Sequence, residues 1–214
     1  MSTDKFMKRI VAPDIAFEKA KSTEIASELH SYTHGINSYP LSLLAIVFSA
    51  LIHNVDHRGV GNAQLATENK KLGDQYNNKS VAEQNSLDLA WNLLLQEQFT
   101  ELRNCLFATE VEMKRFIQVL VNVVLATDIF DKELNDLRKA RWNKAFSSDG
   151  LSDEEHNDLR ATIVIEHIIQ ASDVSHTMQH WHVYRKWNSR LFSELYMAYT
   201  QGRFVKDPSG TLGR

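Results

Sequence analysis

The sequence predicts an all-helical protein with one domain. Only eight Gly and three Pro occur in 214 residues, too few to punctuate the many short strands of a β-sandwich or barrel. Apolar residues recur at intervals of three and four between residues 116 and 125, which is typical of an amphipathic helix. A chain of this length can bury one sizeable core. We therefore expect helices bundled around a single core.

Composition narrows the class of protein. Charged residues make up 24% and hydrophobic residues 43%, the ordinary balance of a folded globular domain. The formal net charge of -3 supplies no basic field for a phosphate backbone, so nucleic acid is not an expected partner. Cys105 is the only cysteine and cannot form an internal disulfide. No apolar run reaches the roughly 18 residues of a membrane span, and no secretory signal opens the sequence. We expect a cytoplasmic location.

The first part of the sequence predicts short helices and then one very apolar helix. Residues 5–21 suggest one or two short helices, and residues 22–40 a further helix followed by a loop. Pro40 suits the first turn of the next helix. Residues 41–52 are apolar on nearly every side, so we expect other helices to surround this one.

Capping signatures predict later helices. Ser80 with Glu83, and Thr109 with Glu112, have the spacing of a capping box, which marks a helix start. The polar segment between the apolar helix and Ser80 predicts surface helix and loop. Further helices are expected over residues 131–146, 153–170 and 180–201, the last rich in aromatic residues.

The residues most suggestive of chemistry follow the apolar helix directly. His53, Asn54, Asp56 and His57 fall within five positions. The two histidines are four residues apart, so on a helix they share a face. Imidazole and carboxylate groups are metal-ligand types, but Asn54 is a neutral amide where a hydrolytic metal centre favours an anionic oxygen.

Two acids at other helix ends are further candidates. Asp128 and Asp173 each follow a predicted helix, and ligands from separate helices can converge inside a bundle. A simpler interpretation is also open, because a single Asp at a helix end is commonly a cap or a surface residue. Glu83 likewise has a simpler interpretation as the partner of Ser80 in a capping box.

Segments in order along the chain resemble one family. A-L-I-H-N-V-D-H-R-G-V at residues 50–60 closely resembles the H-D-x-D-H-x-G motif of the class I 3',5'-cyclic-nucleotide phosphodiesterases, which are HD-domain metal hydrolases. The similarity continues with Y-N-N-K-S-V-A-E at 76–83, L-A-T-D at 125–128, A-S-D-V-S at 171–175, where Ser172 replaces an alanine, and Y-R-K-W at 184–187. Protist forms, some joined to nucleotide cyclases, look nearest. The resemblance implies an all-α, HD-type multi-helix bundle.

The resemblance also implies a chemistry. Two divalent metals, zinc plus magnesium or manganese, would activate a hydroxide that opens the cyclic phosphate of cAMP or cGMP to a 5'-monophosphate. By position, His53 and Asp173 would ligate zinc, and Asn54 stands where an aspartate bridges both metals. The other residues carried over are His57 and Asp128 in the second-metal and water network, Glu83 hydrogen-bonded to that network, and His176 and Trp187 at the substrate. Trp187 and its aromatic neighbours have a simpler interpretation as core residues.

Both ends of the sequence depart from the family pattern. His30 and His34 have the spacing of an upstream H-N-x-x-H-A motif, but they lack its Asn and Ala and lie too close to His53. The purine-binding glutamine and phenylalanine of the family have no counterpart near the other end. We therefore expect a domain incomplete at both termini, with a partial phosphodiesterase domain over residues 1–205 and a disordered tail over 206–214. It would belong to a larger cyclase-linked or receptor protein.

The neutral Asn54 predicts weak metal binding and impaired hydrolysis. Catalytic zinc normally keeps at least three protein ligands, and the resemblance supplies only His53 and Asp173 as ordinary ones. Two other hypotheses stay open. The chain could be a non-catalytic regulatory or nucleotide-binding relative, or an HD phosphohydrolase that uses His30 and His34 as replacement ligands.

Overall fold

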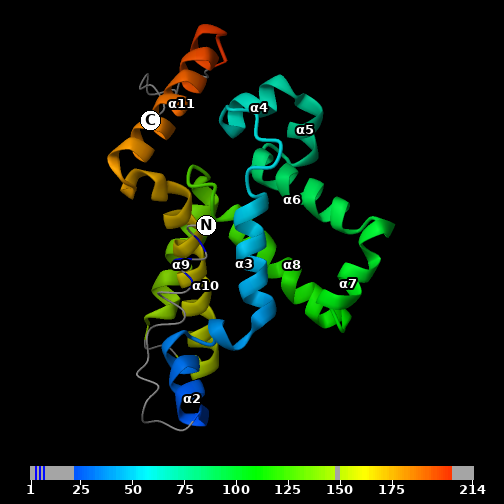
Figure 1. The fold of residues 1–214 in the computed structure, drawn as a ribbon, viewed down its shortest axis with the longest axis vertical. Coiled ribbons are helices and arrows are strands. Elements are labelled where there is room, and N and C mark those ends of the chain that lie inside the picture. The colour runs from blue at the N-terminus through cyan, green and yellow to red at the C-terminus, as the bar shows by residue number, and fades with distance from the viewer. Residues whose placement is uncertain (1–2, 4, 6, 8–21, 148–149, 204–214) are drawn as a thin grey trace.

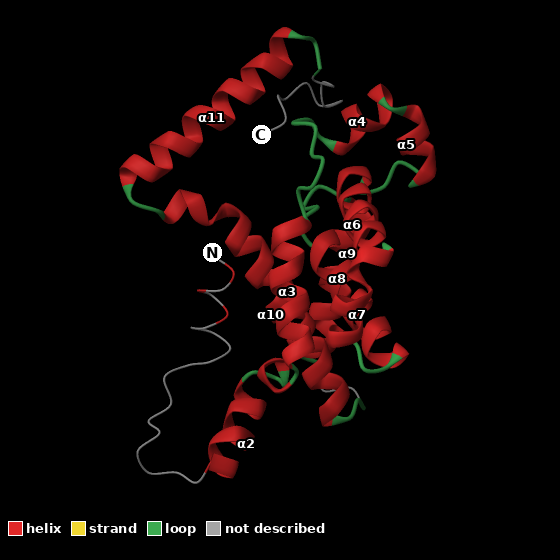
Figure 2. Ribbon diagram, turned by 45° about the vertical axis from the view of Figure 1, so that its right-hand side comes forward, coloured by secondary structure: helices red, strands yellow, loops and turns green. Residues whose placement is uncertain are grey.

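The structure, a computed structural model, describes residues 3, 5, 7, 22–147 and 150–203. In this part of the chain the regular elements are all helices, which confirms the all-helical prediction (Figures 1 and 2). None of these helices is both long and apolar enough to cross a membrane. The helices expected within residues 5–21 and the tail at 206–214 lie outside the described residues.

The centre of the molecule is a group of long helices. Helix α3 (Pro40–Ile52) packs against α8 (Glu110–Leu125), while α10 (Asp153–Asp173) packs against both of them and against α9 (Lys132–Ala145) (Figure 1). One buried cluster joins α3, α8 and α10 through Ile46, Val123, Ile168 and Ile169. A second joins α3, α8 and α6 (Val81–Leu94) through Ala45, Ala90, Phe116, Leu120 and Val124.

Short helices extend this centre. At one end of α3, α2 (Ser22–Tyr32) leads into a 3-10 turn at Ile36–Ser38. At the other end, α4 (Asn62–Glu68) and α5 (Lys70–Gln75) pack with the start of α6. The remaining elements are the 3-10 turns Glu97–Phe99 and Val174–Met178, α7 (Thr100–Leu106) and α11 (Trp181–Thr200).

Local sequence signals explain several of these boundaries. Pro40 occupies the first turn of α3, as predicted. Thr109 and Glu112 form the predicted capping box of α8. The Ser80 capping box is wrong: Ser80 has a φ of 39° and its side chain does not cap α6. Helix α10 runs to Asp173, beyond the predicted end at residue 170, so that Asp173 is the last helical residue.

Two predictions about burial are wrong. Within the part of the chain that the structure describes, other helices do not surround α3, because Leu44, Val47 and Leu51 are 40%, 44% and 76% exposed. The aromatic residues of α11 are not core either, since Trp187 is 49% and Phe192 67% exposed. Both helices are apolar on faces that no described helix covers, and composition alone cannot tell such a face from a core face.

Candidate active site

The candidate site begins where α3 ends. His53 follows Ile52 as the C-cap residue, and the chain turns away through Asp56 and Gly59, with φ of 59° and 70°. The Nδ1 atom of His53 lies 3.0 Å from the carbonyl oxygen of Ala50, a position that suits an Nδ1–H donor. A proton on Nδ1 leaves the lone pair of Nε2 free to face the cavity, as in histidines that bind metals.

Two side chains compete for that Nε2 atom. The amide nitrogen of Asn54 lies 2.8 Å from it, and a carboxylate oxygen of Asp173 lies 3.3 Å from it. The amide donates only to an unprotonated Nε2, whereas the carboxylate attracts a protonated one. Asn54 therefore occupies the lone pair that a metal would use, while Asp173 favours the imidazolium.

The pKa values of this pair reflect the contact. Burial is the largest single effect and lowers the pKa of His53, but the hydrogen bond and charge of Asp173, together with the Ala50 carbonyl and the charge of Glu83, make the net shift upward. The hydrogen bond from His53 lowers the pKa of Asp173, against the opposite effect of burial. When His53 is protonated, the two helix ends are joined by a charge-assisted contact.

Asp128 is buried and fully hydrogen-bonded. One carboxylate oxygen accepts from the Ser80 hydroxyl at 2.8 Å and from the Asn62 amide at 3.1 Å. The other accepts from the backbone N–H groups of Phe130 and Asp131, both at 3.1 Å. One oxygen of Asp128 therefore stabilises the turn that follows α8, while the other belongs to the hydrogen-bond network of Ser80 and Asn62.

Asn62 is a residue of the site that sequence reasoning missed. Its Nδ2 donates to Glu83 at 2.9 Å and to Asp128 at 3.1 Å, and its Oδ1 accepts from the Ala82 N–H at 2.8 Å. A neutral amide between two carboxylates satisfies both and separates their charges. No spacing pattern in the sequence marks this role, because Glu83 belongs to α6 and Asp128 follows α8.

Glu83 points at this network and not at Ser80. Burial raises the pKa of its carboxyl group, and the hydrogen bond from Asn62 opposes that shift. His57 also lines the site: its Nδ1 accepts from the Gly59 N–H at 3.1 Å, which puts the proton of the neutral ring on Nε2. Asp56, by contrast, points away and pairs with Arg58 at 3.0 Å.

A cavity of about 660 Å³ brings most of the predicted residues together. Its lining includes His53, Asn54, His57, Glu83, Asp128 and Asp173. His176 and Trp187 are not among the lining residues, and their contact with substrate stays a prediction. Helix α11 and the residues after it contribute Leu191, Glu194, Leu195 and Arg203, which the sequence had not singled out.

The cavity wall is strongly acidic. The carboxylates that line it belong to Glu83, Asp128, Asp131, Asp173 and Glu194. The lining contains one guanidinium, that of Arg203, and this group is already paired with Glu68 at 2.7 Å. A phosphate anion would be repelled by such a wall unless cations accompanied it.

The donor groups do not complete the expected zinc site. Within residues 3, 5, 7, 22–147 and 150–203, no three His, Cys, Asp or Glu side chains converge in a way that could hold a metal ion. His53 and Asp173 offer two donors, whereas catalytic zinc normally has at least three protein ligands. The oxygens of Asp128 are engaged by hydrogen-bond donors.

His30 and His34 do not supply the missing donors. His30 Nδ1 lies 2.7 Å from the Ser38 hydroxyl, and His34 Nδ1 lies 3.3 Å from the Asn157 amide oxygen. Both precede α3, whereas His53 follows it, and a helix of 13 residues is about 20 Å long. Neither lines the cavity, so the hypothesis of replacement ligands has no support here.

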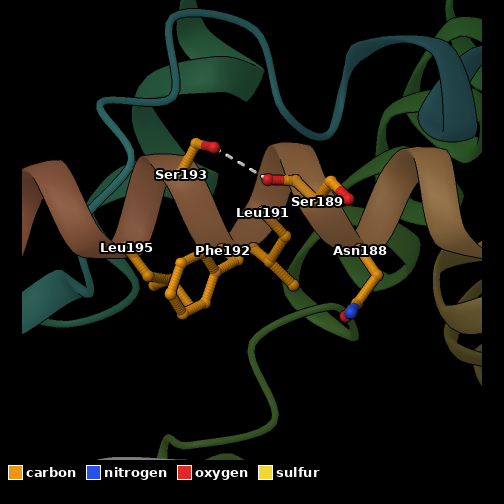
Figure 3. A pocket seen from close by; sticks show the side chains of 6 residues that line it. All are labelled: Asn188, Ser189, Leu191, Phe192, Ser193 and Leu195. Carbon is orange, nitrogen blue, oxygen red and sulfur yellow. Dashed lines mark hydrogen bonds between the residues drawn. The ribbon is translucent and has the colours of Figure 1, made fainter.

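A second hollow lies on α11 alone (Figure 3). Leu191, Phe192 and Leu195 point to one side of the helix, and Ser189 and Ser193 to the other. The hydroxyl of Ser193 donates to the Ser189 carbonyl at 2.9 Å. Because every lining residue belongs to one helix, this is an open surface of mixed polar and apolar side chains and not an enclosed site.

Comparison with known proteins identifies the family. A model of the 3'5'-cyclic nucleotide phosphodiesterase family matches residues 24–206. The chain belongs to this family. The resemblance found in the sequence motifs is thereby confirmed.

Individual relatives of this phosphodiesterase-family chain agree. A probable 3',5'-cyclic-AMP phosphodiesterase, pde-4 of Caenorhabditis elegans, is 28% identical over 165 residues, which cover 72% of this chain and 23% of that protein. The 3',5'-cyclic-AMP phosphodiesterase 4C of Mus musculus is 30% identical over 158 residues, covering 73% and 22%. The chain thus spans less than a quarter of the length of these curated relatives.

Solved structures show the same fold. The phosphodiesterase domain of the Salpingoeca rosetta rhodopsin phosphodiesterase superimposes with a TM-score of 0.61 at 22% identity, covering 80% of this chain and 54% of that one. LmjPDEB1 in complex with IBMX gives a TM-score of 0.60 at 24% identity, covering 86% and 56%. The predicted HD-type helical fold is therefore confirmed.

Proposed function

We propose that this chain is a 3',5'-cyclic-nucleotide phosphodiesterase domain whose hydrolysis of cAMP or cGMP to the 5'-monophosphate is impaired. Family membership supports the substrate class. The observation that carries the impairment is the 2.8 Å contact between the Asn54 amide and His53 Nε2. An amide at this position adds no negative charge and uses the lone pair of the adjacent imidazole.

The experiment is a gain of function. Asn54→Asp adds a carboxylate beside His53 and removes the competing amide donor. The variant and the unmodified chain are assayed for bound zinc and manganese and for cAMP and cGMP hydrolysis. Asn143→Asp is the matched control, because it adds the same charge at an exposed position of α9. We expect Asn54→Asp alone to raise metal content and to raise turnover by about tenfold or more, since an added charged ligand is worth more than 1.4 kcal/mol.

Two results would contradict this proposal. Robust turnover by the unmodified chain with no gain in Asn54→Asp would show that Asn54 does not limit the reaction. If the unmodified chain binds cyclic nucleotide and the Asn54→Asp variant still shows no hydrolysis, the result favours the second candidate, a non-catalytic nucleotide-binding regulator. The engaged oxygens of Asp128 favour that candidate, because they offer no free ligand.

We also propose that the domain functions within a larger receptor-linked or cyclase-linked protein. One solved neighbour is described as the phosphodiesterase domain of a rhodopsin phosphodiesterase, which supports a receptor-linked arrangement. The test is to isolate the polypeptide that carries this domain from its native source. The proposal expects the same polypeptide to contain a membrane receptor or a cyclase.

A further inference from the structure

A pair of histidines at the start of α11 is unused by the proposed function. His180 is the N-cap residue of α11 and His182 is the second residue of the helix. Both side chains are exposed, and neither lines the acidic cavity. Their Nδ1 atoms are only 2.8 Å apart, and their ring centroids are 4.6 Å apart. Two nitrogens at that distance share one proton, because one must donate and the other accept.

The two distances match a particular coordination geometry. Two imidazole nitrogens bound at about 2.0 Å with a right angle at the metal lie about 2.8 Å apart, and their ring centroids about 4.5 Å apart. A tetrahedral angle would separate the nitrogens by about 3.3 Å and the centroids by about 5.2 Å. The pair therefore fits the right-angled arrangement. Nitrogen ligands at right angles are typical of Cu²⁺ and Ni²⁺ sites, and Cu²⁺ binds such ligands more tightly.

We propose that His180 and His182 chelate a Cu²⁺ ion through their Nδ1 atoms, with water in the remaining positions. The ion would take the place of the shared proton. In the neutral pair this needs only a tautomer change, in which the proton on one Nδ1 moves through solvent to Nε2 of the same ring. The backbone fixes the spacing, because His180 has a φ of -53° and a ψ of 142° directly before the helix.

The N-terminal position on the helix lowers the expected affinity for a cation. The N-terminal end of a helix carries a partial positive charge, which opposes a bound cation. This effect acts on the site as a whole, so it does not change the comparison between variants that retain α11. His180 makes no side-chain capping bond to α11, His182 lies on its first turn, and both rings are exposed, so replacing either of them should leave the helical content unchanged.

The test is a Cu²⁺ titration of the whole chain, in which calorimetry measures the affinity and electron paramagnetic resonance measures the ligand field. It is carried out in the unmodified chain and in His53→Ala. This variant removes the imidazole that contacts Asp173 in the cavity. We expect one Cu²⁺ per chain in both, with an axial spectrum split by two nitrogens. His180→Ala and His182→Ala should each weaken binding by about tenfold or more, because each removes one of two ligands. His30→Ala, which removes an exposed imidazole from α2, is the matched control.

Several outcomes would overturn the proposal. One is Cu²⁺ affinity that is the same in the unmodified chain and in the double variant His180→Ala with His182→Ala. A second is an equal loss of affinity in His30→Ala. A third is Zn²⁺ binding at the pair as tight as Cu²⁺ binding, which would contradict the right-angled arrangement. None of these readouts uses hydrolysis, so this proposal and the proposed function can fail separately.

Discussion

His53 Nε2 lies 3.3 Å from Asp173 Oδ1, although 120 positions separate the two residues in the sequence. His53 follows the last residue of α3, and Asp173 is the last residue of α10. Their contact therefore links the ends of two neighbouring helices in the lining of the cavity. The side chains are 14% and 44% exposed, so the contact is only partly shielded from water.

A double-mutant cycle on this pair should give a modest coupling. We expect His53→Ala and Asp173→Ala to couple by about 0.5–1 kcal/mol in the free energy of unfolding, measured by urea denaturation at pH 6. The same cycle on Lys79 and Glu133, whose side chains are 58% and 65% exposed, is the control and should give a smaller value. Equal coupling energies in the two cycles would show that burial does not strengthen the His53 contact.

Removal of Asn62 should be the most costly single change at the site. Asn62→Ala removes hydrogen bonds to Glu83, Asp128 and the Ala82 N–H. The buried Ala82 N–H and Glu83 lose this partner, whereas Asp128 keeps its bonds from Ser80 and from the backbone. We expect a loss of about 2–3 kcal/mol in the free energy of unfolding. Asn85→Ala, which removes one 3.4 Å contact to Asp56, should change it by less than about 0.5 kcal/mol. Similar losses in both variants would mean that the Asn62 network contributes nothing of its own.

The sequence predicted the helices, and most of the predicted site residues line the cavity, because both depend on local patterns. Spacing identified the capping box of Thr109 and placed His53 at a helix end. It failed where the outcome depended on a distant residue. Ser80 has the local pattern of a cap, yet its hydroxyl donates to Asp128, 48 positions away. The role of Asn62 was missed for the same reason, because its two acidic partners meet only in the folded chain.

Gly59 and Gly61 offer a test of the turn beside the site. Gly59 has a φ of 70°, and a Cβ atom there would lie 2.5 Å from a carboxylate oxygen of Glu194. We expect Gly59→Ala to lower the free energy of unfolding by about 1–2 kcal/mol, chiefly because Ala is strained in the left-handed region. Gly61 has open space around it and a φ of -68°, so Gly61→Ala should change stability by less than about 0.5 kcal/mol.

The strain at Gly59 can be separated from the clash. In Glu194→Ala the clashing oxygen is absent. The loss of unfolding free energy that Gly59→Ala still causes on this background therefore measures the backbone strain alone. Urea unfolding of the four proteins gives both quantities. If Gly59→Ala no longer lowers the free energy of unfolding on the Glu194→Ala background, the clash with Glu194, and not the backbone conformation, restricts this position to glycine.

The ion pair of Glu68 and Arg203 should make the attachment of α11 sensitive to acid. Arg203 donates from Nε and Nη2 to the two carboxylate oxygens at 2.8 and 2.7 Å. These bonds, with a further one from Gln64, lower the pKa of Glu68 to about 2 from its ordinary value of 4.5. A lowered pKa in the folded state means that the stabilisation is complete above the unfolded value and is lost as the pH falls through the folded one.

We therefore expect the stability difference between the unmodified chain and Glu68→Gln to be constant above about pH 5 and to shrink as the pH falls from 4.5 towards 2. Urea unfolding at each pH measures the difference, and an NMR titration of the Glu68 carboxyl carbon measures its pKa directly. On an Arg203→Ala background the same comparison should lose this pH dependence, because the main cause of the shift is gone. If the pKa of Glu68 stays near 2 in Arg203→Ala, the shift is caused by Gln64 and not by Arg203. The apolar contacts of Ala198 would then be what attaches the end of α11.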